Sequence, residues 1–92
     1  MTALTAAQIT AELAALPEWR LEDGQLIRNF EFTDFRESMS FVQLIGALAE
    51  REQHHPDIDI RYNRVRLALS THDAHGITAA DINLARAIAT VL

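Results

Sequence analysis

Residues 57–69 read DIDIRYNRVRLAL, and this stretch decides the class of fold. Apolar residues occupy every second position before and after Asn63, and charged residues fill most of the positions between them. Strict alternation is the pattern of a β-strand with one buried face, and two such runs around a polar turn form a hairpin. We therefore predict a β-hairpin here, with its apolar face against a core.

A second hairpin is predicted over residues 19–32. The pair Asp23-Gly24 is a signal for a tight turn, and apolar residues alternate with polar ones on either side of it. Arg28 is the exception, because it falls on the face that Leu26 and Phe30 share. Strands joined by hairpins run antiparallel, so the two hairpins together predict an antiparallel sheet of four strands.

Three helices are predicted around these hairpins. The first follows Thr5, which has the capping-box spacing to Gln8, and should end at Pro17. The last helix follows Thr78. The residues expected on its buried face are Ile82, Ala85, Ala89 and Leu92. The order α-β-β-α-β-β-α predicts the α+β class, with a four-stranded antiparallel sheet and three helices on one face.

The middle helix is predicted over residues 35–52, after a cap at Asp34 and before the extended conformation that Pro56 imposes on its neighbour. Its apolar residues form two adjacent stripes. One stripe comprises Phe35, Met39, Val42, Gly46 and Ala49, and the other comprises Phe41, Leu44, Ile45 and Leu48. A surface helix needs only one apolar face. One stripe can pack on the sheet, so we expect the other to be free for a second subunit.

Length and composition limit the possible functions. The 92 residues allow one domain with one core, spanning residues 1–92, and 49% of them are hydrophobic. Because 13 acidic residues outnumber 8 basic ones, direct binding of nucleic acid is not expected. The chain has no cysteine, no export signal and no apolar run of the roughly 20 residues that span a bilayer. We expect a cytoplasmic protein that does not bind membranes.

All four histidines fall between residues 54 and 75. Imidazole, with an ordinary pKa of about 6.5, both gives and takes protons near neutral pH, so converging histidines suit general acid/base catalysis. His75 lies beside Gly76 and is interpreted as a surface group. Zinc is a rival interpretation, because the His54-His55 pair and His72-x-x-His75 could supply nitrogen ligands. The chain has neither an HExxH motif nor a cysteine pair, so no metal is expected.

Several ordered motifs make the chain resemble the pterin-4a-carbinolamine dehydratase family. They are Glu50-x3-His54-His55-Pro56, Tyr62-Asn63, Ser70-Thr71-His72 and Asp81-Ile82-Asn83-Leu84-Ala85, with Pro17-Glu18-Trp19 and Phe30-x-Phe32-x-Asp34-Phe35 upstream. The resemblance runs from about residue 17 to the end. It departs from the family pattern at His75 and at Ile58, where an aromatic residue is often found.

The resemblance implies a hydro-lyase, a 4a-hydroxytetrahydrobiopterin dehydratase, usually assembled as a homodimer or homotetramer. Such an enzyme converts a 4a-hydroxytetrahydropterin to the quinonoid dihydropterin and water, which regenerates the pterin cofactor after aromatic amino-acid hydroxylation. No metal, nucleotide or redox cofactor is implied. The implied catalytic residues are His54, His55 and His72. The implied pterin contacts are His54, His55, Pro56, Thr71, His72, Asp73 and Ala74, with Glu50 and Asp81 in supporting roles.

We expect His54 and His72 to transfer the protons and His55 to orient the substrate. Glu50 lies one helical turn before His54, so it is predicted to fix the tautomer of that imidazole. The main alternative is a non-catalytic dimerisation or assembly cofactor that acts through the 35–52 helix, because the family includes a dimerisation cofactor of a homeodomain transcription factor. A metal-dependent hydrolase is the third possibility.

Overall fold

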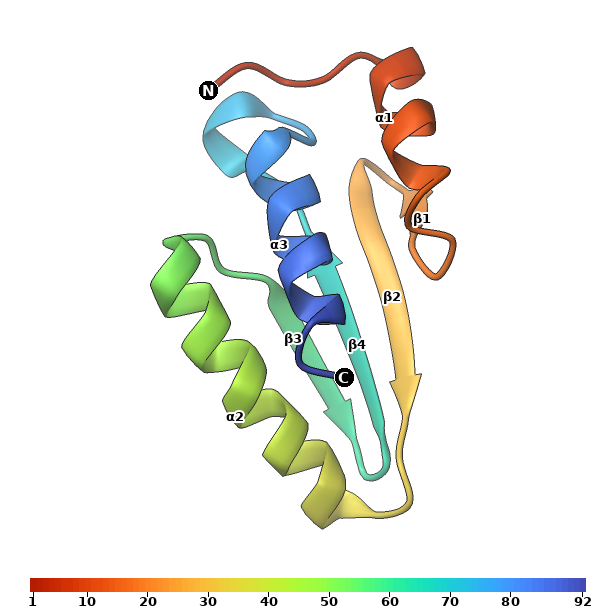
Figure 1. Ribbon diagram of the computed structural model, residues 1–92, viewed down its shortest axis with the longest axis vertical. Helices are drawn as coiled ribbons and strands as arrows, with labels where there is room; N and C mark the ends of the chain where they lie inside the picture. The colour runs from red at the N-terminus through yellow and green to blue at the C-terminus, as the bar shows by residue number, and fades with distance from the viewer.

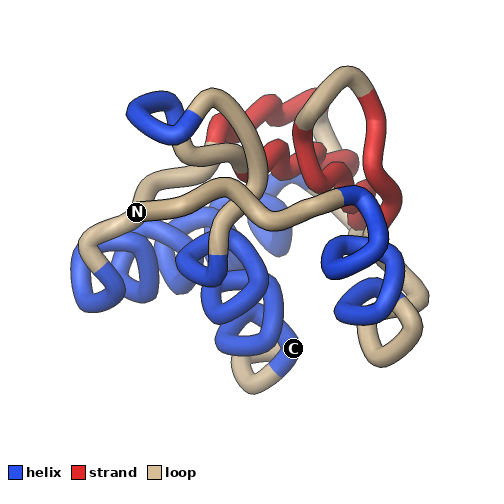
Figure 2. The backbone as a smooth tube through the Cα atoms, turned by 90° about the horizontal axis from the view of Figure 1, so that it is seen from above, coloured by secondary structure: helices blue, strands red, loops and turns tan.

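The computed structural model describes residues 1–92 and has the predicted α+β architecture. The elements are α1 (Ala6–Leu13), β1 (Arg20–Glu22), β2 (Gln25–Glu31), α2 (Phe35–Glu52), β3 (Asp57–Arg61), β4 (Arg64–Leu69), a 3₁₀ turn η1 (His72–Ala74) and α3 (Ala79–Ala89). The four strands form one antiparallel sheet in the order β1-β2-β4-β3. Figure 2 shows the sheet as one layer and the helices packed on one side of it.

Both hairpin turns use the left-handed backbone region. Asp23 and Gly24 have φ values of 50° and 75°, which is the requirement of the tight turn that follows the twist of two antiparallel strands. Tyr62, in the β3–β4 turn, has a φ of 53°. The long pairing of β2 with β4 joins the two hairpins and makes β4 an inner strand (Figure 1). The end of β4 is thereby placed next to elements from both halves of the chain.

The helix α2 has the predicted bounds. At its start the Asp34 carboxylate accepts a hydrogen bond of 2.9 Å from the backbone N–H of Glu37. It ends at Gln53, whose φ of 53° is a left-handed helix terminus. Its buried residues are Ser38, Phe41, Ile45, Leu48 and Ala49. Its exposed large apolar residues are Phe35, Met39 and Leu44. The predicted division into two stripes is wrong at Ala49, which is buried, and at Leu44, which is exposed, so the apolar surface left open on α2 consists of Phe35, Met39 and Leu44.

The other two helices differ in detail from expectation. The helix α1 ends at Leu13, four residues before Pro17, and residues 14–16 continue as hydrogen-bonded turns. Pro17 disfavours helical backbone only at Leu16, so the proline alone does not set the end of the helix at Leu13. On α3 the buried residues are Asp81, Ile82, Leu84, Ala85 and Ile88. Ala89 and Leu92 are exposed, so the predicted face was wrong at these two positions, where the helix ends.

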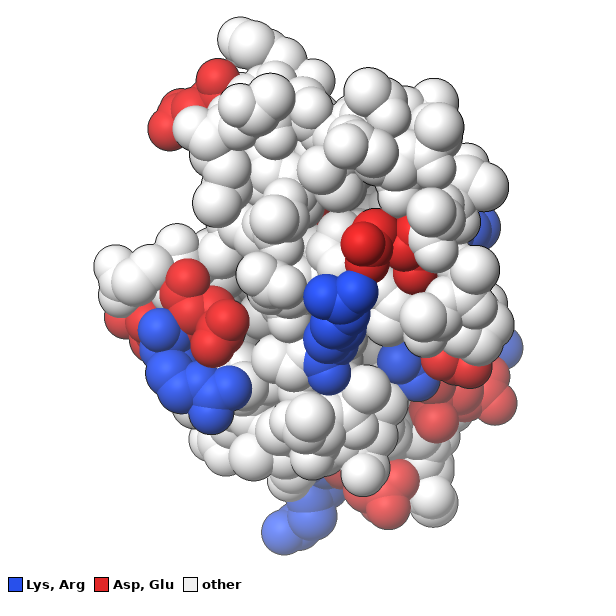
Figure 3. Space-filling view, turned by 45° about the horizontal axis from the view of Figure 1, so that its top comes forward, with Lys and Arg blue, Asp and Glu red and all other residues white.

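The core lies between the sheet and the helices. Its fully buried members include Leu26, Ile45, Leu67 and Leu84, from two strands and two helices. Arg28 is accommodated at the edge of this core, because its guanidinium carbon lies 4.5 Å from the centre of the Phe30 ring. None of the helices is long and apolar enough to cross a membrane. Figure 3 shows acidic and basic side chains intermixed on the face it draws.

Candidate active site

Three of the four histidines line one hollow at the end of β4. The hollow has a volume of about 290 Å³ and is lined by residues from the C-terminal end of α2 and from the segment that follows β4. Its lining residues are Gln53, His54, His55, Ser70, Thr71, His72 and Asp73. The inner position of β4 brings residues 70–73 next to residues 53–55, so segments that are distant in sequence form one site.

His54 is held by a buried carboxylate. Its Nε2 lies 2.6 Å from Oδ1 of Asp81, which is in the first turn of α3. The Asp81 side chain is 0% exposed and the His54 side chain is 15% exposed. A carboxylate only accepts hydrogen bonds, so the neutral His54 ring carries its proton on Nε2 and leaves Nδ1 as an acceptor.

The Asp81 carboxylate is itself fixed through its second oxygen. Oδ2 accepts hydrogen bonds from the Thr71 hydroxyl at 2.8 Å and from the backbone N–H of Thr78 at 2.9 Å. The second bond belongs to the capping box at the start of α3. The Thr71 and Thr78 hydroxyls also lie 2.9 Å apart. The orientation of His54 is therefore set by the helix cap and by the segment after β4 together.

His55 has a different and more exposed partner. Its Nε2 lies 2.5 Å from Oε2 of Glu50, and the two side chains are 61% and 75% exposed. The expectation that Glu50 orients His54 is thus wrong, because Glu50 binds His55 and Asp81 binds His54. The reason is local: the left-handed conformation of Gln53 ends α2, so His54 no longer lies one helical turn above Glu50. An exposed ion pair of this kind adds little to stability.

His72 begins the turn η1 and is exposed. The backbone around it is closed by the hydrogen bond from His75 N–H to the His72 carbonyl at 3.0 Å and by the bridge between Thr71 and Gly76. The ring of His72 makes no side-chain hydrogen bond, in contrast to the ring of His54. His54 and His72 therefore line the same hollow in different states: the His54 ring is bound to a carboxylate, and the His72 ring has no side-chain partner.

Some of the remaining predicted site residues line the hollow and others do not. Thr71 and Asp73 line the hollow, whereas Pro56 and Ala74 flank the lining segments without lining it. Gln53 and Ser70 line it but were not predicted. In the sequence, each of these two residues directly precedes a predicted site residue, and this position could have identified them as lining residues.

The structure contains no group of three or more His, Cys, Asp or Glu side chains placed to hold a metal ion. The zinc interpretation of His72-x-x-His75 therefore has no matching ligand cluster.

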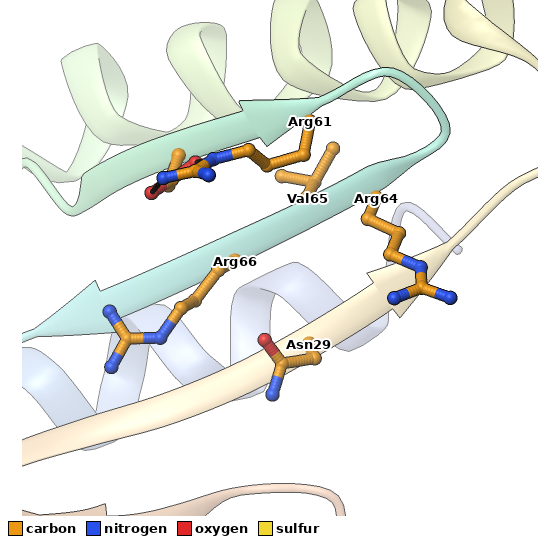
Figure 4. A pocket seen from close by; sticks show the side chains of 6 residues that line it. Asn29, Arg61, Arg64, Val65 and Arg66 are labelled. Atoms are coloured by element: carbon orange, nitrogen blue, oxygen red, sulfur yellow. Dashed lines mark hydrogen bonds and ion pairs between the residues drawn. The ribbon is translucent and has the colours of Figure 1, made fainter.

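A further hollow of about 260 Å³ lies on the outer face of the sheet and contains three arginines (Figure 4). Arg61 donates to Asp59 at 3.0 Å, and this hydrogen bond and the charge of Asp59 raise the pKa of Arg61 above its ordinary value. The side chains of Arg64 and Arg66 point away from each other in Figure 4. This hollow offers no group that titrates near neutral pH, so it does not suit proton transfer.

The chain matches the model of one protein family over residues 2–91, and the description of that family is pterin 4 alpha carbinolamine dehydratase. A relative from Chloroflexus aurantiacus, provisionally named a pterin-4-alpha-carbinolamine dehydratase, is 49% identical over 92 residues, which cover 100% of this chain and 99% of the relative. A relative from Acidobacterium capsulatum with the same provisional name is 50% identical over 92 residues, and 100% of both chains is covered.

Two solved structures are similar to this fold. The crystal structure of a transcriptional coactivator/pterin dehydratase from Brucella melitensis has a TM-score of 0.92 and 34% identity, with 98% of each chain covered. A pterin dehydratase-like protein identified as a RuBisCO assembly factor in the alpha-carboxysome has a TM-score of 0.64 and 19% identity, over 79% of this chain and 84% of that chain. At that identity the second likeness supports the fold alone.

Proposed function

Because this chain belongs to the pterin 4 alpha carbinolamine dehydratase family, we propose that it dehydrates a 4a-hydroxytetrahydropterin to the quinonoid dihydropterin. The observation that carries the proposal is one hollow in which a histidine anchored to a buried carboxylate accompanies a histidine with a free ring. The reaction needs a proton acceptor and a proton donor, and the hollow offers both. In this proposal residues 1–92 act as one cytoplasmic domain and need no bound cofactor, since only side chains move protons.

The proton transfers are assigned to His54 and His72. His54 accepts a proton from a ring nitrogen of the pterin at Nδ1, because the Asp81 carboxylate on its other side stabilises the imidazolium that forms. His72 donates a proton to the 4a-hydroxyl as the C–O bond breaks, and the oxygen leaves as water. One proton is taken and one is given, so the pterin loses water and the protein has no net change in charge.

His55 is assigned the role of orienting the substrate. It lines the same hollow, but its partner Glu50 is highly exposed and holds it less firmly than Asp81 holds His54. In this proposal Thr71 and Asp73 contact the pterin, with Pro56 and Ala74 at the margin. Thr71 also acts through Asp81 to position His54.

The activity is tested by generating the carbinolamine with a pterin-dependent hydroxylase and following its ultraviolet decay. We expect the protein at catalytic concentration to accelerate the decay above the spontaneous rate. The Arg66→Ala variant, on the outer face of the sheet, is expected to retain the full acceleration and serves as a control for a folded protein. If folded wild-type protein gave no acceleration, the dehydratase proposal would fail, and the assembly role through α2 would take its place.

We further propose a homodimer or homotetramer that buries the exposed apolar residues of α2, which are Phe35, Met39 and Leu44. Met39→Asp places a charge in the middle of this apolar surface, and burying an unpaired charge is strongly unfavourable. We expect wild type to sediment at two or four times the mass of a single chain at micromolar concentration, and the variant to fall to the mass of one chain. A wild-type mass equal to one chain would contradict the proposal.

A further inference from the structure

Thr78 carries a buried hydroxyl group to which the mechanism above assigns no role. The residue is 0% exposed and is the N-cap of α3. The first residues of the chain lie against it: the backbone N–H of Leu4 donates to the carbonyl of Ile77 at 2.7 Å, and Sδ of Met1 lies 3.0 Å from the Thr78 hydroxyl (Figure 1). A hydroxyl group buried in this way needs hydrogen-bond partners within the protein.

The direction of the hydrogen bonds around Thr78 follows from the chemistry of its neighbours. The Thr71 hydroxyl has one proton and lies 2.8 Å from Oδ2 of Asp81 and 2.9 Å from the Thr78 hydroxyl. An ionised carboxylate only accepts, so the Thr71 proton points to Asp81. In its contact with Thr78 the Thr71 oxygen can then only accept, and the Thr78 hydroxyl is the donor. The Met1 sulfur is a weak acceptor and competes little for this proton.

The Thr78 oxygen is held in turn by the helix. It accepts a hydrogen bond of 3.2 Å from the backbone N–H of Ala80, which is the capping contact of α3. A continuous chain therefore runs from this N–H through the hydroxyls of Thr78 and Thr71 to Oδ2 of Asp81. The other oxygen of that carboxylate lies 2.6 Å from Nε2 of His54. Hydrogen bonds in such a chain polarise and strengthen one another where water is excluded.

The proton of Thr78 decides where the proton of Thr71 points. Without it the Thr71 oxygen has no donor, and the Thr71 hydroxyl is free to rotate toward the hollow that this residue lines. Oδ2 of Asp81 would then keep only the backbone N–H of Thr78 as a fixed donor. A carboxylate held by fewer donors orients the His54 ring less strictly.

We propose that Thr78 is a positioning residue for the dehydration, whose hydroxyl directs the Thr71 proton to Asp81 and thereby keeps the proton of His54 on Nε2. This inference rests on the proposed dehydratase function, because it concerns the residue assigned there as the base. Thr78 does not line the hollow and so does not contact the substrate. Its loss should therefore lower kcat and leave KM nearly unchanged.

The test compares Thr78→Val with Thr5→Val. Thr5 is the N-cap of α1, and its hydroxyl accepts from the backbone N–H of Gln8 at 3.1 Å, so the control removes a helix-capping hydroxyl that is not linked to His54. For Thr78→Val we expect kcat to fall about 5- to 10-fold, as for one lost hydrogen bond, with KM changed less than about 2-fold. Thr5→Val should keep the kcat and KM of wild type. Thr78→Ser retains the hydroxyl and should restore most of the kcat.

A double variant tests whether Thr78 acts through Thr71. In a Thr71→Val protein the Thr78 proton has no oxygen to hold, so adding Thr78→Val should leave kcat at the value of Thr71→Val alone. Losses that multiply in the double variant would overturn the chain. The same holds for a wild-type kcat in Thr78→Val, or for an equal loss in Thr5→Val.

Long-range ¹H–¹⁵N spectra of the His54 ring, recorded without substrate, separate this inference from the proposed activity. We expect protonated Nε2 in wild type and in Thr5→Val, and a mixture of the two tautomers in Thr78→Val. If wild type does not accelerate carbinolamine decay but the spectra differ in this way, the dehydratase proposal fails and the action of Thr78 on His54 is supported. If Thr78→Val has the wild-type spectrum, the positioning role is rejected whatever the activity. Glycine is tolerated at an N-cap, so Thr78→Gly takes the place of a valine variant that does not fold.

Discussion

His72→Ala is expected to lower kcat/KM for the carbinolamine by about 10²–10⁴-fold, the contribution of one positioned acid or base. The same variant should leave the free energy of unfolding within about 0.5 kcal/mol of wild type, as for an exposed side chain that makes no internal contact of consequence. His72 meets this description, because it is exposed on a loop whose closure uses only backbone bonds. Steady-state kinetics and urea denaturation of the same preparation measure the two quantities.

His55→Ala is the matched control for this prediction, since it removes a second exposed imidazole from the same hollow. Its expected effect is a higher KM with kcat little changed, as for a group that orients the substrate. Turnover that survives in His72→Ala would contradict the assignment of the acid. Turnover that disappears in His55→Ala with unchanged substrate affinity would contradict the division of roles between the histidines.

Local signals in the sequence were sufficient for most of the fold. The bounds of α2 follow from the cap at Asp34 and from Pro56, and both act within a few residues. The pairing of β2 with β4 has no such local signal, since it joins residues about 40 apart. Ile27 and Ala68 are partners in this pairing, and both are buried although they lie on the outer side of the sheet. The alternating pattern of a single strand does not show which of its outer residues the folded chain buries.

The site was predictable as a set of residues and less so as a set of contacts. The histidines could be grouped by their closeness in sequence and by the family motifs. The partner of each histidine depends on one backbone conformation, the left-handed Gln53, which turns His54 away from Glu50 and toward Asp81. The β1–β2 turn and residues 70–76 together line a further hollow of about 390 Å³, and only the assembled sheet brings these two segments side by side.

Because Asp81, and not Glu50, binds His54, Asp81→Asn is expected to lower kcat/KM by about 10²–10⁴-fold. An asparagine keeps the shape of the side chain, and its oxygen can still accept from Thr71 and from the N–H of Thr78. Its NH₂ group then faces Nε2 of His54, which must accept a hydrogen bond in place of donating one. The neutral ring moves its proton to Nδ1, so the nitrogen assigned as the base becomes a donor.

Asp81→Ala separates this tautomer effect from a structural one. Alanine leaves the Thr71 hydroxyl and the Thr78 N–H without their partner at a buried site, so the free energy of unfolding should fall by about 2–4 kcal/mol. Asp81→Asn should cost about 1 kcal/mol or less, because the cap remains. Long-range ¹H–¹⁵N spectra of the His54 ring report the tautomer directly: protonated Nε2 is expected in wild type and protonated Nδ1 in Asp81→Asn. If the asparagine variant kept wild-type kcat/KM with its proton on Nδ1, His54 would not be the base, and the buried carboxylate would serve only the helix cap.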